Sequence, residues 1–381
     1  MVLDGIDHEK WLLCLGRVKR ALDILSHPER SYKSVIVGGT NGKGSTCVYL
    51  ERILCTKGFS VGTNLSPHVT SFNERFRIDS RQVSIEEINS LANRLRPLLE
   101  GVGLTYFEWC VVLAAALFQE SGVDVGIFEV GLGGRLDASN AMEHDMAIIT
   151  SISLDHGDYL GHTLRDITRE KAFISRPGRP VITCNDGDIV DVIEGYATGI
   201  NAKLMVVHEP LGLQLGIEGS MQGLNAALAL KAAQLMGLEP NSMELAYTLN
   251  TAFLPGRVEG IGNAVILDVA HNVSSMVSLV EHLKHIGFNG TGVLGILRDK
   301  DYMEMAIHLK EVCKRIHVSG LPTERSWGAD AIREVEGLGG IYLYESVREA
   351  FHAALNLGAP VVVTGSFYTV GEVRDILICL G

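Results

Sequence analysis

The stretch "VIVGGTNGKGST", residues 35–46, decides the fold, because an apolar run leads directly into a glycine-rich turn that carries one lysine. This pattern predicts a buried strand, a tight turn and the beginning of a helix. The common phosphate loop reads G-x-x-x-x-G-K-[ST]. Here position 37 is a valine and Gly44 follows Lys43, so the hydroxyl groups arrive only at Ser45 and Thr46. The sequence therefore indicates a phosphate loop of an uncommon form.

Short apolar runs alternate with helical patterns around this loop. Alternation of this kind is typical of a mostly parallel sheet covered by helices. The runs predicted as strands are 34–39, 124–131, 146–153 and 179–183, and the segments predicted as helices are 43–58 and 105–122.

A second series of strands follows "LPGR" at 254–257, namely 264–272, 291–297, 315–320, 340–346 and 360–366. We therefore expect an α/β protein with two domains, since a chain of 381 residues exceeds one ordinary core. Residues 1–254 should form a phosphate-loop ATPase domain with a mostly parallel sheet. Residues 255–381 should form a smaller Rossmann-like α/β domain.

Composition excludes several classes of protein. A formal net charge of −12 argues against a general nucleic-acid binder. No apolar run approaches the length of about 18 residues that a membrane span needs. The seven cysteines include no C-x-x-C pair, as expected of reduced thiols in the cytosol. The beginning of the sequence, "MVLDGIDHEKWLLCLG", has acidic residues before its apolar stretch, unlike a signal peptide. We expect a cytoplasmic protein.

Polar side chains follow three of the predicted strands at the point where each strand ends. The first strand leads into the phosphate loop, the second ends near Glu129, and the third is followed by His156. Ligands of open parallel sheets bind outside the carboxyl ends of the strands. The sequence therefore predicts that a phosphate loop, a carboxylate and a histidine meet at one edge of the sheet.

The charges at this edge suggest an ATP–magnesium site. Backbone N–H groups of Gly42–Ser45 can cradle phosphate oxygens at a helix N-terminus, and Lys43 can neutralise the β- and γ-phosphates. A hydroxyl of Ser45 or Thr46 can reach Mg²⁺, and the carboxylate of Glu129 is a suitable oxygen ligand.

Each residue also has a plain structural alternative. Glu129 could cap a helix or pair with a cation, and His156 and His271 could be satisfied structural histidines. Lys171 stands among alternating charges, as on a solvated helix face, and Arg257 could belong to a linker.

Ten motifs resemble those of the dihydrofolate synthase/folylpolyglutamate synthase family of the Mur ligase superfamily, and they occur in the order found in that family. The motifs span nearly the whole chain: "GTNGKGST" (39–46), "SPHVTSFNERFRID" (66–79), "LTYFE" (104–108), "EVGLGGRLDASN" (129–140), "TSISLDHGDYLG" (150–161), "REKAFI" (169–174), "LPGRVE" (254–259), "LDVAHN" (267–272), "GILRDKD" (295–301) and "VVTGSFYTVGEV" (362–373).

The resemblance implies a reaction between ATP, L-glutamate and dihydropteroate or a reduced folate. The acceptor carboxylate takes the γ-phosphoryl group and becomes an acyl phosphate, and the amine of glutamate then displaces phosphate. All three substrates are anionic, so Lys43, Arg135, Arg257, Lys300 and a metal ion should reverse the net charge locally. The alternatives are a folylpolyglutamate synthase alone, or a phosphate-loop ATPase or switch that forms no bond.

The resemblance also assigns roles by position. It implies that the catalytic residues are Lys43, His156 and Lys171, the last as a carbamate. It implies that the magnesium ligands are Ser45, Ser66, Glu129 and His156. The residues expected to bind ATP are Gly39, Thr40, Asn41, Gly42, Lys43, Gly44, Ser45 and Thr46, with Arg257, His271 and Asn272 of the second domain. The residues expected to bind the acceptor are Ser66, Pro67, His68, Phe107, Asp137 and Asn140. A monomer is expected.

Overall fold

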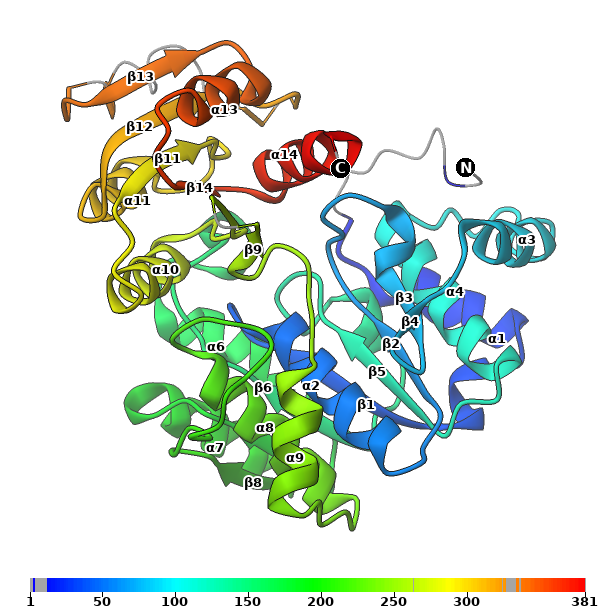
Figure 1. Ribbon diagram of the computed structural model, residues 1–381. Helices are drawn as coiled ribbons and strands as arrows, with labels where there is room; N and C mark the ends of the chain where they lie inside the picture. The colour runs from blue at the N-terminus through cyan, green and yellow to red at the C-terminus, as the bar shows by residue number, and fades with distance from the viewer. Residues whose placement is uncertain are drawn as a thin grey trace. The chain divides into compact units, whose positions relative to one another are not determined.

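The computed structural model describes residues 3, 12–262, 264–323, 325–326, 334–335 and 337–380. The chain divides into two compact units. Unit 1 extends to Gly216 and includes Gln222–Ala252, and unit 2 comprises Ile217–Met221 and the chain from Phe253 onward. Each unit has its own sheet (Figure 1).

The sheet of unit 1 is formed by β1 Lys33–Gly38, β2 Val61–Asn64, β3 Phe76–Ile78, β4 Arg81–Gln82, β5 Val125–Glu129, β6 Met146–Ile149, β7 Pro180–Thr183 and β8 Lys203–Val206. Within the described part of the chain, its eight strands have the order β4-β3-β2-β5-β1-β6-β7-β8. The strands from β2 to β8 in this order are parallel, and β3 and β4 pair antiparallel at one edge. The phosphate loop after β1 therefore lies between the ends of β5 and β6.

Helices cover both faces of this sheet. Ile36 of β1 and Phe128 of β5 pack against α4, α6 and α7 on one face, while α2 and α8 contact each other and the opposite face. The helices of unit 1 are α1 Leu15–Ile24, α2 Lys43–Thr56, α3 Ile85–Leu95, α4 Tyr106–Glu120, α5 Gly157–Leu160, α6 Leu164–Ala172, α7 Gly187–Gly199, α8 Gln222–Leu235 and α9 Ser242–Asn250.

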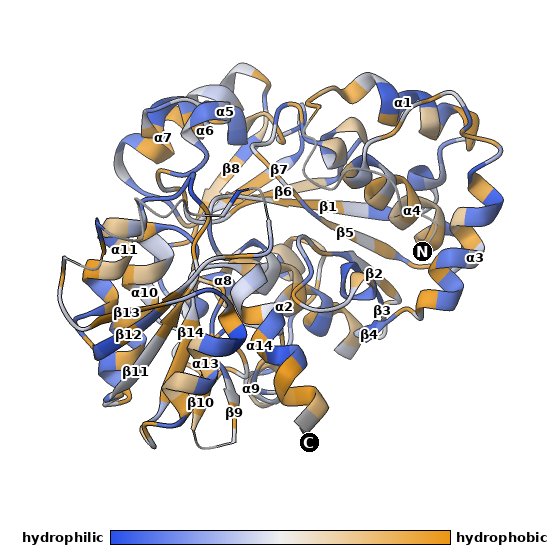
Figure 2. Ribbon diagram, turned by 90° about the horizontal axis from the view of Figure 1, so that it is seen from above, coloured by the Kyte–Doolittle hydropathy of each residue, from blue (hydrophilic) through white to orange (hydrophobic). Residues whose placement is uncertain are grey.

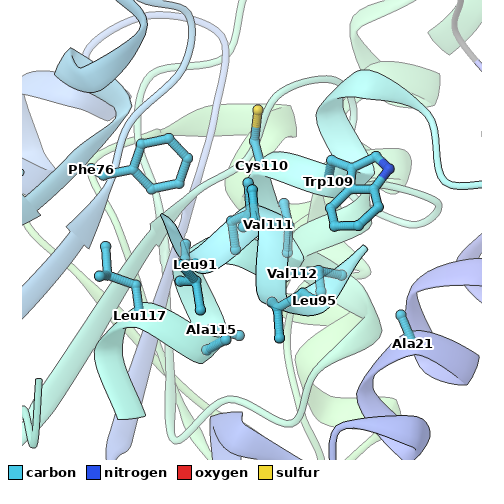
Figure 3. Close-up of a cluster of buried hydrophobic side chains, with 14 of the residues drawn as sticks. Ala21, Phe76, Leu91, Leu95, Trp109, Cys110, Val111, Val112, Ala115 and Leu117 are labelled. Carbon is cyan, nitrogen blue, oxygen red and sulfur yellow. The ribbon is translucent and has the colours of Figure 1, made fainter. Parts of the chain in front are cut away.

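A large apolar core lies beneath α4. Figure 3 shows buried side chains of this helix together with Phe76 of β3, Leu91 and Leu95 of α3, and Ala21 of α1. The helix is apolar on nearly every side, which is typical of a buried helix. By contrast, α3 alternates apolar and polar residues, because only one side of it faces the core (Figure 2). The core thus fixes the beginning of α4 beside the strand ends.

Unit 2 is a smaller sheet with helices on both faces. Its strands are β9 Glu259–Ile261, β10 Val265–Leu267, β11 Gly290–Leu294, β12 Cys313–Ser319, β13 Ile341–Tyr344 and β14 Val361–Thr364, in the order β13-β12-β11-β14-β10-β9. All pairs are parallel except β9 with β10. Leu294 and Ile316 pack towards α10 Val273–His285 and α11 Tyr302–Leu309, while α13 Val347–Leu355 and α14 Phe367–Leu380 contact the sheet as well.

The expected α/β class is confirmed, and both sheets are mostly parallel. The predicted strands are present, although several are shorter than expected. The segment 264–272 leaves the sheet after Leu267, because Asp268 and Asn272 bind backbone N–H groups of loops and of α10. In the described residues, no helix has the length and apolarity needed to cross a membrane.

Candidate active site at the strand ends of unit 1

The loop after β1 has a backbone that only glycine can follow. Gly39 has φ 134° and Gly42, which precedes α2, has φ 86°. A Cβ atom at Gly39 would lie 1.9 Å from Oγ1 of Thr150, and one at Gly42 would lie 2.3 Å from Oδ1 of Asn225. Any other residue would therefore displace the loop from the β6 end or from α8.

Hydrogen bonds join this loop to the segment that follows β6. The N–H of Thr40 donates to the carbonyl of Ser151 at 2.8 Å, and the hydroxyl of Ser151 donates to the carbonyl of Asn41 at 3.2 Å. The N–H of Ser153 donates to Oγ1 of Thr40 at 3.1 Å. Lys43 Nζ donates to the carbonyl of Thr40 at 2.9 Å, so the lysine folds back along its own loop. These bonds within unit 1 fix the shape of the loop.

Several buried hydroxyl groups at this edge lack a hydrogen-bond partner among the described residues, including those of Ser45, Thr46 and Ser66. Such atoms are uncommon in folded proteins, and a missing ion or ligand is one explanation. Ser45 and Thr46 lie in the first turn of α2, and no side chain caps that helix at Gly42. This turn can therefore accept phosphate oxygens and a cation.

Glu129 and Ser66 meet because β2 and β5 are neighbouring parallel strands. Glu129 is buried at the end of β5, and its Oε2 accepts the N–H of Ser66 at 2.7 Å. The expected carboxylate and one expected hydroxyl ligand of magnesium thus stand side by side. The peptide bond between Ser66 and Pro67 is cis.

His156 lies immediately before α5 in the left-handed backbone region, with φ 53°. Its N–H donates to Oδ1 of Asp155 at 2.8 Å, and its Nε2 lies 3.8 Å from Oδ2 of the same residue. Both of these contacts join His156 to its neighbour Asp155. Its expected contact with magnesium stays a prediction.

Lys171 on α6 is buried, and its Nζ donates to the carbonyl of Gly39 at 2.7 Å. The alternative of a solvated helix face is therefore wrong. Burial lowers the pKa of Lys171 to about 7, and the charge of Lys43 acts in the same direction, whereas Asp155 and Asp137 oppose the shift. An amine of this pKa is partly uncharged at neutral pH, which makes it reactive.

Helix α6 approaches the loop after β5 so closely that Gly134 has no room for a side chain. A Cβ atom there would lie 2.5 Å from the carbonyl oxygen of Glu170 and 3.0 Å from Cα of Lys171. The next residue, Arg135, pairs with Glu170 through an Nε–Oε1 distance of 2.9 Å. Gly134 therefore sets how near Lys171 can come to the strand ends.

The residues expected to bind the acceptor fall into two groups. Asp137 is buried, and its two oxygens accept the N–H groups of Gly131, Leu132 and Ser139 and the hydroxyl of Ser139. Burial raises the pKa of Asp137 although these bonds oppose the shift. Asn140 likewise donates within its surroundings, to the carbonyls of Arg135 and Phe173. Both residues hold the loop in shape, and their contact with substrate stays a prediction.

The second group lies closer to the strand ends. The ring of Phe107 fills the space in front of Gly131, where a Cβ atom would lie 2.6 Å from it. Nδ1 of His68 accepts a hydrogen bond from Nε of Arg75 at 2.8 Å. His68 thus lies in the loop that follows β2, and Phe107 lies at the beginning of α4 against the segment that follows β5.

In unit 2 the expected ATP-binding residues gather beside Phe367. The guanidinium of Arg257 lies 5.3 Å from the centre of that ring, and the ring of His271 lies 5.7 Å from it. Oδ1 of Asn272 accepts the N–H of Ser275 and caps α10. The three residues therefore lie in one part of unit 2, and their contact with ATP stays a prediction.

Sequence reasoning assigned no role to Glu74, Arg75 or Asn225. Glu74 accepts the N–H groups of Val69, Thr70 and Ser71 and the hydroxyl of Thr70, so it shapes the loop that begins at Ser66. The motif "SPHVTSFNERFRID" contains Glu74 and Arg75, yet nothing in its pattern separates a loop anchor from an ordinary surface charge. Asn225 gives no local signal, because it meets the phosphate loop only through the packing of α8 on α2.

Matches to two protein-family models identify the class of protein to which this fold belongs. Residues 37–206 match the Mur ligase middle domain, and residues 256–367 match the Mur ligase glutamate ligase domain. Both matches place the fold in the class of Mur ligases, which are ATP-dependent ligases.

Two curated relatives narrow the class. The dihydrofolate synthase/folylpolyglutamate synthase of Escherichia coli is 35% identical over 364 residues, which cover 90% of this chain and 86% of the relative. The protein of the same description from Bacillus subtilis is 31% identical, with 95% and 94% covered. The chain therefore belongs to the dihydrofolate synthase/folylpolyglutamate synthase family.

Solved structures agree over nearly the full length. Escherichia coli FolC in complex with DHPP and ADP has a TM-score of 0.89 and 31% identity, covering 99% of this chain and 96% of that one. The bifunctional enzyme of Yersinia pestis with AMPPNP and Mn has a TM-score of 0.89 and 32% identity, with the same coverage.

Proposed function

We propose that this chain joins L-glutamate to dihydropteroate, giving dihydrofolate, and adds further glutamates to reduced folates at the expense of ATP. The names of its relatives support both activities. So do the solved structures, which hold DHPP with ADP in one case and Mn, AMPPNP and L-glutamate in another. Residues 1–254 would supply the ATP and acceptor sites, and residues 255–381 the ligase domain. We further propose a cytoplasmic monomer.

One observation carries the proposal. Four neighbouring strands, β2, β5, β1 and β6, end in the Ser66 loop, Glu129, the phosphate loop and the segment before His156. A site for acyl phosphate formation needs a phosphate cradle, a cation and a place for a metal within reach of one carboxylate substrate. This sheet edge offers each of them.

A divalent cation fits the donors that the edge provides. Ser45, Ser66, Glu129 and His156 would hold Mg²⁺, and the buried hydroxyls of the two serines lack a hydrogen-bond partner in the described residues. Oxygen ligands of this kind suit Mg²⁺, which usually keeps waters and binds substrate phosphates in addition. When bound, the ion would neutralise charge on the transferred phosphoryl group.

The chain's own groups would act in sequence. The N–H groups at the beginning of α2 would hold the phosphate oxygens, and Lys43 would move from the carbonyl of Thr40 to the γ-phosphate. A carboxylate oxygen of the acceptor would attack phosphorus while ADP leaves, giving an acyl phosphate. The amine of glutamate would then attack the acyl carbon, and phosphate and a proton would leave. Lys43 would stabilise the charge that develops in the first step.

Lys171 would act as a carbamate. Its uncharged amine would form a bond to the carbon of CO₂ and release a proton, which exchanges the cation for an anion. The lowered pKa of Lys171, about 7, and its position beside Gly39 support this step. The resulting anion would orient the metal that serves the γ-phosphate.

The remaining assignments follow the resemblance. Arg257, His271 and Asn272 would bind the nucleotide, together with loop residues from Gly39 to Thr46. The acceptor would contact Ser66, Pro67, His68 and Phe107, with Asp137 and Asn140 shaping the adjoining loop.

A folylpolyglutamate synthase without the first activity is the second candidate. A relative of that description from Lacticaseibacillus casei is 29% identical over 95% of this chain. The third candidate is a phosphate-loop switch that forms no bond. Membership of a family of ATP-dependent ligases argues against it.

The test is phosphate release from ATP by the purified full chain. We expect release when L-glutamate is present together with either dihydropteroate or tetrahydrofolate, and no release when glutamate or the acceptor is left out. Release with glutamate and tetrahydrofolate, but not with glutamate and dihydropteroate, would support the candidate that has the second activity alone. Release that ignores both acceptors would contradict ligation altogether.

A further inference from the structure

Two arginines at the beginning of β3 differ in one respect. Arg75 and Arg77 flank the core residue Phe76, and their exposed fractions are 7% and 8%. Arg77 pairs with Glu51 of α2, with Nε–O distances of 3.2 and 3.0 Å and an Nη2–Oε2 distance of 2.8 Å. Glu51 is fully buried. Arg77 therefore has the counter-ion that a buried charge requires.

Among the residues that the structure describes, the partners of Arg75 are neutral. Its Nε donates to Nδ1 of His68 at 2.8 Å, and that nitrogen can accept only when it carries no proton. Its guanidinium carbon lies 5.6 Å from the ring centre of Tyr106. The neighbouring carboxylate of Glu74 is occupied by the Val69–Ser71 backbone.

Across the part of the chain that the structure describes, no acidic side chain forms an ion pair with Arg75. A mostly buried charge is costly unless it is paired, so the surroundings of Arg75 favour the arrival of an anion. The beginning of α4 at Tyr106 cannot supply it, because the N-terminal end of a helix carries partial positive charge.

The position of Arg75 indicates where the anion comes from. The N–H of Leu65 donates to the carbonyl of Arg75 at 3.0 Å, which places the arginine beside the loop that begins at Ser66. Tyr106 precedes Phe107, the residue in front of Gly131. Strands β2 and β5 separate β3 from β1 and its phosphate loop. Arg75 thus lies on the acceptor side of the site rather than on the nucleotide side.

We propose that Arg75 binds a carboxylate of the pteroate or folate acceptor, and that this carboxylate is its counter-ion. The inference rests on the proposed function and adds a specificity-determining residue to it. His68 occupies Nε, which leaves the two terminal nitrogens for the two oxygens of a carboxylate, a geometry in which arginine binds strongly. In dihydropteroate this carboxylate is also the group that takes the phosphoryl group, so loss of the contact should weaken acceptor binding and slow turnover as well.

The test compares a ligand that carries this carboxylate with one that lacks the whole aminobenzoate. Dissociation constants of dihydropteroate and of 6-hydroxymethyl-7,8-dihydropterin, which lacks the benzoate, are measured for wild type, Arg75→Met, Arg75→Lys and the matched control Arg77→Met. We expect Arg75→Met to weaken dihydropteroate binding by about 10- to 100-fold, as for a lost charged hydrogen bond. Binding of the neutral pterin should be unchanged. The dihydropteroate affinity of Arg75→Lys should lie between those of wild type and Arg75→Met, because lysine keeps the positive charge but cannot donate two parallel hydrogen bonds to one carboxylate.

Thermal unfolding separates this role from a structural one. Arg75→Met should unfold at the same or a higher temperature than wild type, since it removes an unpaired buried charge. Arg77→Met should unfold at a lower temperature, because Glu51 loses its partner. Should Arg77→Met fail to fold, Arg77→Lys replaces it as the control.

Three results would overturn the inference. Equal losses for both ligands in Arg75→Met would indicate a damaged pocket, and a raised KM for ATP with normal acceptor binding would place the anion on the nucleotide. An unchanged affinity for dihydropteroate would remove the contact. Failure of the proposed function itself is seen separately, as wild type that neither binds dihydropteroate nor releases phosphate with it and glutamate.

Discussion

The end of β10 in unit 2 differs from the strand ends of unit 1 in how its polar groups are hydrogen-bonded. At the edge of unit 1, the buried hydroxyls of Ser45, Thr46 and Ser66 have no hydrogen-bond partner among the described residues. At the end of β10 in unit 2, the carboxylate of Asp268 accepts the N–H groups of Val258 and Ala270, at 2.9 and 2.8 Å. Unit 1 thus keeps donors and acceptors for a ligand, whereas this part of unit 2 uses them to shape its own loops.

Glu259 extends the contrast. Its Oε2 accepts the N–H of Gly256 at 2.8 Å, and both oxygens accept from Nε of Arg374 on α14. Val258 between them has φ 47°, a region that a β-branched residue rarely adopts. Unit 2 therefore holds the "LPGRVE" loop, and with it Arg257, in a strained shape. Variants in unit 1 should affect chemistry, and variants in unit 2 should affect loop position.

Lys43→Ala should give the largest effect. The loop would lose the cation nearest the transferred phosphoryl group, so we expect turnover to fall by about 100-fold or more. Folding should be little affected, because the hydrogen bond from Lys43 Nζ to the carbonyl of Thr40 lies within the phosphate loop itself. Steady-state phosphate release and a thermal unfolding curve check both statements. Near-normal ligation by the folded variant would contradict the role of the loop.

Lys171→Arg should follow, with a loss of about 10- to 100-fold, as for a group that orients a metal. Arginine keeps its positive charge and cannot form a carbamate, so bicarbonate should not restore it. Lys171→Ala should be as poor, and a short carboxylate in solution should rescue it in part. The exposed Lys33→Arg is the control. Full activity of Lys171→Arg in bicarbonate-free buffer would end the carbamate proposal.

The activity of wild type should also depend on pH through Lys171. Its pKa of about 7 lies below the usual value of 10.5, so the uncharged amine becomes common only as pH rises through 7. At a fixed partial pressure of CO₂, we expect activity to be lost below pH 7 and gained above it. Lys171→Ala rescued by a short carboxylate should not share this dependence, and an identical profile would point to another group.

Glu129→Gln should mainly change the requirement for Mg²⁺. The amide oxygen can still accept the N–H of Ser66, so shape is kept while charge is lost. We expect the Mg²⁺ concentration for half-maximal activity to rise on the order of 10-fold. A magnesium titration that superimposes on that of wild type would remove Glu129 from the proposed ligands.

Glu259→Gln in unit 2 should have the smallest effect on chemistry. Loss of its charge weakens the pair between Glu259 and Arg374, and we expect a cost of about 1–3 kcal/mol in unfolding free energy. The KM for ATP should rise while kcat stays near wild type. Glu120→Gln, in the exposed pair with Arg94, should change neither quantity. A fall in kcat with normal ATP KM would erase the contrast between the units.

The sequence was sufficient where chemistry follows directly from strand order. The phosphate loop, Glu129 and the segment before His156 could be placed at one edge, because the ends of parallel strands share that edge. It was insufficient where a role depends on a distant partner. Arg75 and Arg77 look alike in "NERFRI", and only the packing of Glu51 on α2 separates a paired arginine from an unpaired one.

The crowded position of Gly134 has a consequence for mutational surveys of this protein. A survey that scores growth or activity would mark Gly134 as intolerant of every substitution, as it would mark Lys43. The cause would be the 2.5 Å that a Cβ atom would leave to the carbonyl of Glu170, not a contact with substrate. Intolerance at 134 should therefore be relieved by changes that let α6 shift, whereas intolerance at 43 should not. Pairwise surveys, rather than single ones, would separate residues that react from residues that make room for them.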